Sequence, residues 1–221
     1  MQKKYSIQIF VIFIFTFFVF LPKNSYANEP KVWFTPEENW EFRSKLTISD
    51  GSALLGRSIS ISGDYAIVGA LDAAYIFRRE GIDWIEEERL LPSDGAGCGW
   101  MLGCPVSISG DYAVVGASDS AYVFKREGER WIEQIKLTID DKWADFGKSV
   151  LISGSYVFIG APEDILFHGA IYIFKRNGTS WEEKDKLIPY SNDEMYFGQS
   201  IAISGNYLVY NLRRRGIAFH L

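Results

Sequence analysis

The chain has 221 residues, of which 48% are hydrophobic, 16% aromatic and 23% charged. This apolar content is enough to build a packed core, and it excludes a disordered or collagen-like chain. The 23 basic and 28 acidic residues give a net charge of −5. Because no general basic surface can then follow a phosphate backbone, we expect no nucleic acid among the partners.

Residues 1–27 have the pattern of a secretory signal peptide. Lys3 and Lys4 precede an apolar run over residues 9–21. A small-residue site that ends at Ala27 follows this run. A membrane anchor is the alternative, but a spanning helix needs about 20 apolar residues. We therefore expect cleavage after Ala27 and an exported mature chain, which would be periplasmic, on the cell surface or secreted.

After a lead-in over residues 28–39, one sequence unit recurs at intervals of 44 to 51 residues. The motif Ile-Ser-Gly-Asp-Tyr, or a close variant, places its glycine at Gly63, Gly110, Gly154 and Gly205. A tryptophan recurs with nearly the same period, at Trp40, Trp84, Trp131 and Trp181. So many coincident positions indicate one supersecondary unit that is used several times.

Each unit is predicted to contain four short antiparallel strands. In the first unit, residues 58–62 alternate serine and isoleucine, which is typical of a strand with one apolar face. Gly63 and Asp64 follow, and glycine before Asp, Asn or Ser indicates a two-residue type II′ hairpin. Further apolar runs over residues 65–70 and 74–78 predict the second and third strands. The fourth strand begins at the tryptophan.

Four-stranded units that repeat about every 40 to 50 residues are typical of β-propeller blades. The three complete blades are predicted at 56–94, 103–141 and 147–190, with an orphan outer strand at 40–50 and a partial blade at 198–221. If the strands at the two chain ends together built one blade, the propeller would have about four blades, near the lower limit for propellers. The sequence leaves open a closed small ring, a partial or open propeller, a part of a ring built from several chains, and a truncated chain.

Two units open with Phe146-Gly147 and Phe197-Gly198, and Gly160-Ala161-Pro162 ends a second strand. These motifs resemble the FG-GAP repeat, the blade of integrin α-subunit propellers and of many exported bacterial proteins. The resemblance covers residues 40–221. It implies a propeller fold and an interaction role, and it implies no reaction.

Integrin-type repeats carry a calcium loop that resembles Asp-x-Asp-x-Asp-Gly. At that place this chain has only Glu163 and Asp164. Six or more oxygen ligands are hard to collect from two carboxylates, so we expect two solvated acids, no metal and no cofactor.

The cysteines Cys98 and Cys104 lie in one predicted loop. Outside the reducing cytosol, a disulfide between them is the favoured state, and two free thiols are the alternative. A zinc site is disfavoured because two sulfur atoms do not supply four ligands.

These features favour an exported, non-enzymatic interaction module that presents its inter-blade loops to a protein or glycan partner. The candidate contacts are apolar residues in loops that should be polar, namely Trp100, Met101, Ile165, Leu166 and Phe167. Packing of these side chains against a neighbouring blade is the alternative.

Two other functions remain open at this stage. A carbohydrate-active propeller hydrolase or lyase would need paired carboxylates, whereas the predicted inner strands contain no acids. A truncated propeller fragment would have no independent activity. Self-association that completes or covers the propeller edge is a further expectation.

Overall fold

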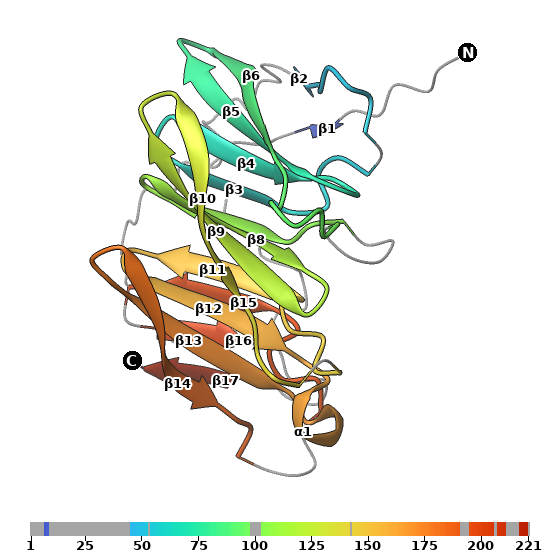
Figure 1. Cartoon of the computed structure of the whole chain (residues 1–221), viewed down its shortest axis with the longest axis vertical. Coiled ribbons are helices and arrows are strands. Elements are labelled where there is room, and N and C mark those ends of the chain that lie inside the picture. Colours follow the sequence, from blue (N-terminus) through green and yellow to red (C-terminus); the bar gives the residue numbers. More distant parts are fainter. Residues whose placement is uncertain are drawn as a thin grey trace, which may run out of the picture.

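The structure is a computed structural model that describes residues 7–8, 45–52, 54–97, 103–141, 143–190, 195–205, 207–210 and 217–220. Within these residues every regular element is a β-strand, except for the four-residue helix α1 (Asp164–Phe167) (Figure 1). No helix in the described part of the chain is both long and apolar enough to cross a bilayer. The all-β class predicted from the sequence is therefore confirmed.

The strands form three complete blades and one three-stranded blade, each an antiparallel meander in chain order. Blade 1 contains β3 (Ile59–Ser62), β4 (Tyr65–Gly69), β5 (Ala74–Glu80) and β6 (Asp83–Leu90). Blade 2 contains β7 (Val106–Ser109), β8 (Tyr112–Ala117), β9 (Ser120–Glu127) and β10 (Arg130–Leu137). Blade 3 contains β11 (Ser149–Ser153), β12 (Tyr156–Ala161), β13 (Ala170–Asn177) and β14 (Ser180–Leu187). Blade 4 contains β15 (Ile201–Ser204), β16 (Tyr207–Tyr210) and β17 (Ile217–His220).

The hairpins between the first and second strands have the predicted turn. Gly110 has a φ of 58°, and Asp111, which follows it, is not among the residues with positive φ. A type II′ turn requires positive φ at its first position alone, so the residue pair and the backbone agree. The same combination occurs at Gly63 and Gly154.

Serine side chains join each inner strand to the next. Because an inner strand ends its sheet, its outward N–H groups need acceptors. In the first junction, the Oγ atoms of Ser58, just before β3, and of Ser60 and Ser62 within it accept backbone hydrogen bonds from blade 2. The donors are the N–H groups of Val106 (3.0 Å), Ile108 (3.1 Å) and Gly110 (2.9 Å), in that order. In the second junction Ser107 accepts from Ile152 (3.1 Å) and Ser109 from Gly154 (3.3 Å). The serine alternation seen in the sequence therefore serves the blade junctions.

The recurring glycine motifs face each other across these junctions. A Cβ atom on Gly160 would lie 1.8 Å from the carbonyl oxygen of Gly198, and one on Gly116 would lie 2.2 Å from that of Gly147. The Gly-Ala pair of one blade thus packs on the Phe-Gly pair of the next. The phenylalanines of these pairs, Phe146 and Phe197, are buried in the core.

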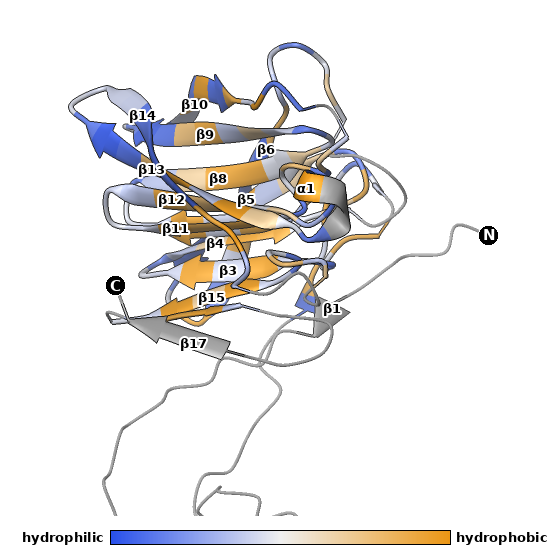
Figure 2. Cartoon of the chain, turned by 90° about the horizontal axis from the view of Figure 1, so that it is seen from below, coloured by the Kyte–Doolittle hydropathy of each residue, from blue (hydrophilic) through white to orange (hydrophobic). Residues whose placement is uncertain are grey.

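The four blades follow one another in an open arc, and the outer strand β14 is its most hydrophilic part (Figures 1 and 2). At each end of the arc, apolar residues that are buried in the middle blades are exposed. Ile61 of blade 1 is 41% exposed, whereas its equivalent in blade 2, Ile108, is 4% exposed. Val209 of blade 4 is 46% exposed, whereas its equivalent Val114 is fully buried. Of the architectures left open by the sequence, the structure has the open, partial propeller.

The predicted outer strand at 40–50 is described only from Lys45 onward. Strand β2 (Lys45–Leu46) pairs with β1 (Ile7–Gln8), and no described strand pairs with the outer edge of β17. Leu46 is buried in the core of blade 1. Leu90 and Leu137 end the fourth strands of blades 1 and 2 and lie in the cores of blades 2 and 3 in the same way. Leu46 therefore occupies the position of a preceding fourth strand.

Candidate functional site

The two ends of the blades differ in their connections. In an antiparallel meander, the loops between second and third strands lie at the same end as the linkers from one blade to the next. We call this end the loop end, and the end with the two-residue hairpins the turn end. Helix α1 lies in the loop between β12 and β13, so it belongs to the loop end (Figure 1).

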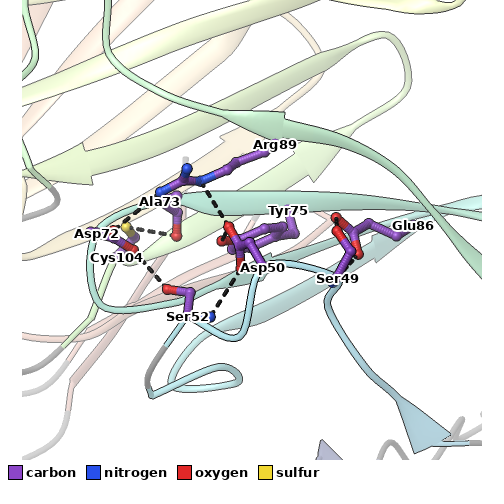
Figure 3. Close-up of polar contacts among 9 residues, drawn as sticks. All are labelled: Ser49, Asp50, Ser52, Asp72, Ala73, Tyr75, Glu86, Arg89 and Cys104. Atoms are coloured by element: carbon purple, nitrogen blue, oxygen red, sulfur yellow. Dashed lines mark hydrogen bonds and ion pairs between the residues drawn. The ribbon is translucent and has the colours of Figure 1, made fainter.

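A buried tyrosine anchors the loop end of blade 1 (Figure 3). The Tyr75 hydroxyl donates a hydrogen bond of 2.6 Å to Oδ2 of Asp50. The Nε atom of Arg89 lies 3.4 Å from the same oxygen. The backbone N–H of Ser52 donates to the other oxygen, Oδ1, at 3.0 Å. The linker before blade 1 is thereby fixed to the third strand of that blade.

Blade 2 repeats this arrangement. The Tyr122 hydroxyl lies 2.9 Å from both carboxylate oxygens of Asp94, and Nζ of Lys136 lies 2.6 Å from Oδ2. The ammonium group also lies 5.4 Å from the centre of the Tyr122 ring, within the range of a cation–π interaction. In both blades the carboxylate comes from the linker that precedes the blade.

In blade 3 the carboxylate comes from α1 instead. The Tyr172 hydroxyl donates to Oδ2 of Asp164 at 2.6 Å, and Nζ of Lys186 lies 2.7 Å from this oxygen. Asp164 is 4% exposed, so the expectation that both acids of this loop are solvated is wrong for Asp164. Its carboxylate is buried because a tyrosine and a lysine satisfy it. Glu163 is exposed, as expected.

These contacts shift the pKa values of the groups involved. Burial, reinforced by the hydrogen bond to the nearby carboxylate, raises the pKa of Tyr75 and that of Tyr172 to about 12. Burial alone would lower the pKa of Lys186, but its hydrogen bonds with Asp164 and Tyr172 outweigh this effect and raise it. The hydrogen bond from Lys136 is the largest of the contacts that lower the pKa of Asp94 to about 2.

Backbone hydrogen bonds tie α1 to the linkers on both sides of blade 3. The N–H of Glu163 donates to the carbonyl of Ala144 at 3.0 Å, and the N–H of Phe197 donates to the carbonyl of His168 at 2.9 Å. Three segments that are far apart in the sequence are therefore held together at the loop end of blade 3.

These three segments carry large apolar side chains that are exposed to solvent. We call them the loop-end patch: Trp143, Ile165, Ile188, Tyr190 and Met195. Trp143 is 87% exposed and Tyr190 is 97% exposed. Ile165 is 42% exposed and has a φ of 49°. A β-branched residue rarely adopts this left-handed conformation.

Of the residues predicted to contact a partner, Ile165 lies in the loop-end patch. Leu166 and Phe167 belong to α1, but their side chains lie outside the described residues, as do Trp100 and Met101. The sequence prediction missed Trp143 and Tyr190. The sequence carried a signal for both, because each is a large aromatic residue in a predicted linker, outside every predicted strand.

Of the two cysteines, the structure describes only Cys104. It is buried and disulfide-bonded, and its Sγ atom lies 3.1 Å from the carbonyl oxygen of Ala73. Cys98 is the one other cysteine of the sequence and lies outside the described residues. The Cys98–Cys104 pairing therefore stays a prediction.

A groove of about 520 Å³ lies between the first strands of the four blades at the loop end. Arg57, Lys148 and Gln199 line it together with serines of the inner strands. Its one carboxylate among the described residues is Asp145, which forms an ion pair of 2.9 Å with Lys148. No group of three His, Cys, Asp or Glu side chains in the described part of the chain is placed to hold a metal ion.

Comparison with known proteins identifies the repeat. A family model described as FG-GAP repeat matches residues 40–77 and 84–126. Both matches begin at the recurring tryptophan and run through the first strands of the following blade. No curated protein matches the chain. Residues 40–77 and 84–126 therefore carry FG-GAP repeats, which supply the first three strands of blades 1 and 2 of the open β-propeller.

Proposed function

We propose that the protein is an exported, non-enzymatic interaction module that holds a protein or glycan partner at the loop end of its propeller. The observation that carries this proposal is the loop-end patch. It gathers large exposed apolar side chains on linkers, where polar residues are the rule. Several large apolar side chains exposed at one end of a soluble protein are typical of an interaction surface.

The helix that carries Ile165 is tied to the core of blade 3, which favours binding. Asp164 of this helix accepts a hydrogen bond of 2.6 Å from Tyr172 and lies 2.7 Å from Nζ of Lys186. A surface that is already ordered loses little conformational entropy when a partner arrives. The left-handed backbone of Ile165 supports the same proposal, because strained residues gather at functional sites.

The inter-blade groove gives no support to carbohydrate cleavage. Glycoside hydrolysis usually needs two carboxyl groups on opposite sides of the scissile bond. The groove presents Asp145 as its one described carboxylate, and that group is already ion-paired with Lys148. Binding without chemistry is the simpler use of this end of the molecule.

Export rests on the N-terminal signal pattern. We expect the protein isolated from the periplasm or the medium to begin at Asn28, and intact-mass measurement tests this. A full-length chain recovered from membranes would contradict export.

The binding test compares the two ends of the propeller. The purified protein is applied to a glycan array and to a solubilised extract of cell-surface proteins, and each partner is then measured by interferometry. The double variant Trp143→Ala/Ile165→Asp should weaken binding at least tenfold, because it removes apolar contacts at the patch. Ile82→Ala is the matched control, since Ile82 is 74% exposed but lies at the turn end. A partner that is lost with Ile82→Ala and kept by the double variant would overturn the proposal.

A further inference from the structure

We propose that two copies of the chain associate head to tail, so that residues 40–46 of one copy form the missing fourth strand of blade 4 in the other. Trp40 of the first copy then enters the pocket between blades 3 and 4 of the second. This inference concerns the end faces of the arc and is independent of the loop-end patch.

The first reason is the pocket itself, which has a volume of about 380 Å³. Its apolar lining includes Tyr156, Phe158, Ile173 and Ile203. In the junction of blades 1 and 2, the equivalent positions are Tyr65, Ile67, Ile76 and Ile108, and all four belong to the cluster that contains Trp131 of the fourth strand. The pocket is therefore the place that a fourth-strand tryptophan occupies elsewhere in the arc.

The second reason is a repeated aromatic contact. Tyr65 meets Trp131 edge to face with ring centroids 5.9 Å apart, and Tyr112 meets Trp181 in the same way at 6.1 Å. Tyr156 is the next tyrosine in this series, but no described tryptophan follows in blade 4. Trp40 is the recurring tryptophan that lies one period before Trp84 and precedes blade 1.

The third reason is the position of the segment after Trp40. Leu46 is buried on blade 1, and the N–H of Ser49 donates to Oε2 of Glu86 at 2.8 Å. In the next junction the N–H of Ser93 donates to Glu133 in the same way, also at 2.8 Å. Residues 45–50 thus already lie as the end of a fourth strand against blade 1. The described residues include no other strands of that preceding blade on this side.

Blade 4 of another copy supplies three such strands. Its exposed Val209 would lie against Ile59 and Ile61, the exposed apolar residues of the inner strand of blade 1. This repeats the junction that the chain already uses between its own blades. Within one chain this junction does not form, since Ile61 and Val209 are both exposed in the arc. Two copies related by a two-fold axis satisfy both ends at once and give about eight blades, within the range of known propellers.

The first measurement is the mass of the purified protein in solution by sedimentation and light scattering at micromolar concentration. We expect the mass of two chains. The mass of a single chain across the whole concentration range would overturn the proposal, because it would mean that the end faces have no second copy as partner.

Variants then identify the surface. Trp40→Ala and Val209→Asp should each weaken the dimer at least tenfold, the first by emptying the pocket and the second by placing a charge in an apolar junction. Trp143→Ala is the matched control, because this tryptophan lies at the loop end, and its dimer should be unchanged. A dimer unaffected by Trp40→Ala and Val209→Asp would use another surface and would contradict the proposal.

Mixing the two damaged variants tests the head-to-tail geometry. Trp40→Ala weakens one side of a junction and Val209→Asp weakens the other. In a mixed pair both substitutions fall in the same junction, so the second junction is intact. The mixture should therefore associate more tightly than either variant alone. If the mixture remains as weak as the separate variants, the association is not head to tail. Unchanged thermal unfolding midpoints of the variants at a concentration that keeps all chains monomeric show that the fold is intact.

Discussion

Blades 2 and 3 anchor the same tyrosine with carboxylates from different parts of the chain. Tyr122 of blade 2 binds Asp94 in the preceding linker, whereas Tyr172 of blade 3 binds Asp164 in α1 of its own blade. The lysine near the end of the fourth strand completes both groups. In both blades a carboxylate therefore lies beside the tyrosine hydroxyl. This carboxylate comes from the linker before the blade or from the loop between its second and third strands.

The exchange changes how deeply the carboxylate is buried. The Asp94 side chain is 40% exposed, while that of Asp164 is 6% exposed. The linker acid of blade 3, Asp141, still accepts a hydrogen bond of 3.0 Å from the N–H of Trp143, as Asp94 does from Ala96. The use of an acid from α1 therefore ties this helix to the core of blade 3, while the turn of the linker is kept.

The largest expected effect is a loss of stability, which should be greater when Asp164 is removed than when Asp94 is removed. Asp164→Ala should lower the free energy of unfolding by about 3 kcal/mol, because it leaves Tyr172 and Lys186 without their partner in a largely buried place. Asp94→Ala should cost less, because solvent reaches its lysine pair. Denaturant unfolding of both variants gives the comparison.

The control for this pair is Glu163→Ala, which removes the neighbouring exposed acid and should leave stability nearly unchanged. Equal losses at Asp94 and Asp164 would show that burial of the carboxylate makes no difference between the blades.

The next effect concerns alkaline pH. In the unfolded chain tyrosine releases its proton near pH 10, but burial and the carboxylates raise the pKa of Tyr75 and Tyr172 to about 12. Between these values the folded state binds more protons than the unfolded state, so stability is complete below pH 10 and falls as the pH rises toward 12. Each tyrosine should contribute a loss of about 2 kcal/mol across this window.

The variant Tyr172→Phe isolates the contribution of blade 3. It should flatten part of the decline between pH 10 and 12 in denaturant midpoints measured at each pH. A decline as steep in this variant as in the parent protein would mean that the Asp164 contact does not hold the proton on Tyr172.

The repeat and its strands could be predicted from the sequence because they depend on local rules. Alternation of serine and isoleucine places β3, and the glycine before Asp64 sets the hairpin that follows. The predicted strands agree with the observed ones to within a few residues. The arc of blades also follows from the repeat, because a blade has two faces to cover and its neighbours are built alike.

The buried carboxylate of blade 3 could not be predicted in this way. In blades 1 and 2 the acid precedes its tyrosine by 25 and 28 residues, whereas Asp164 precedes Tyr172 by only 8. Whether that spacing brings the two side chains together depends on the path of α1, which the alternation rules do not describe. The openness of the arc was also left undecided by the sequence, because closure depends on the angle between blades and no residue pattern encodes that angle.

The smallest expected effect tests whether blades 2 and 3 are alike at the turn end. Gly110 and Gly154 each have a φ of 58°, and a Cβ atom on either would meet nothing within 4 Å. The variants Gly110→Val and Gly154→Val should therefore lose the same free energy of unfolding, about 1–2 kcal/mol, because only the left-handed backbone opposes the new side chain.

Gly97 is the matched control, since a Cβ atom there also meets nothing within 4 Å and its φ is not positive. Gly97→Val should cost less than either hairpin variant in thermal or denaturant unfolding. Equal and negligible losses at Gly110, Gly154 and Gly97 would mean that the glycines of the repeat do not set tight hairpins. Unequal losses at Gly110 and Gly154 would instead extend the difference between blades 2 and 3 from the loop end to the turn end.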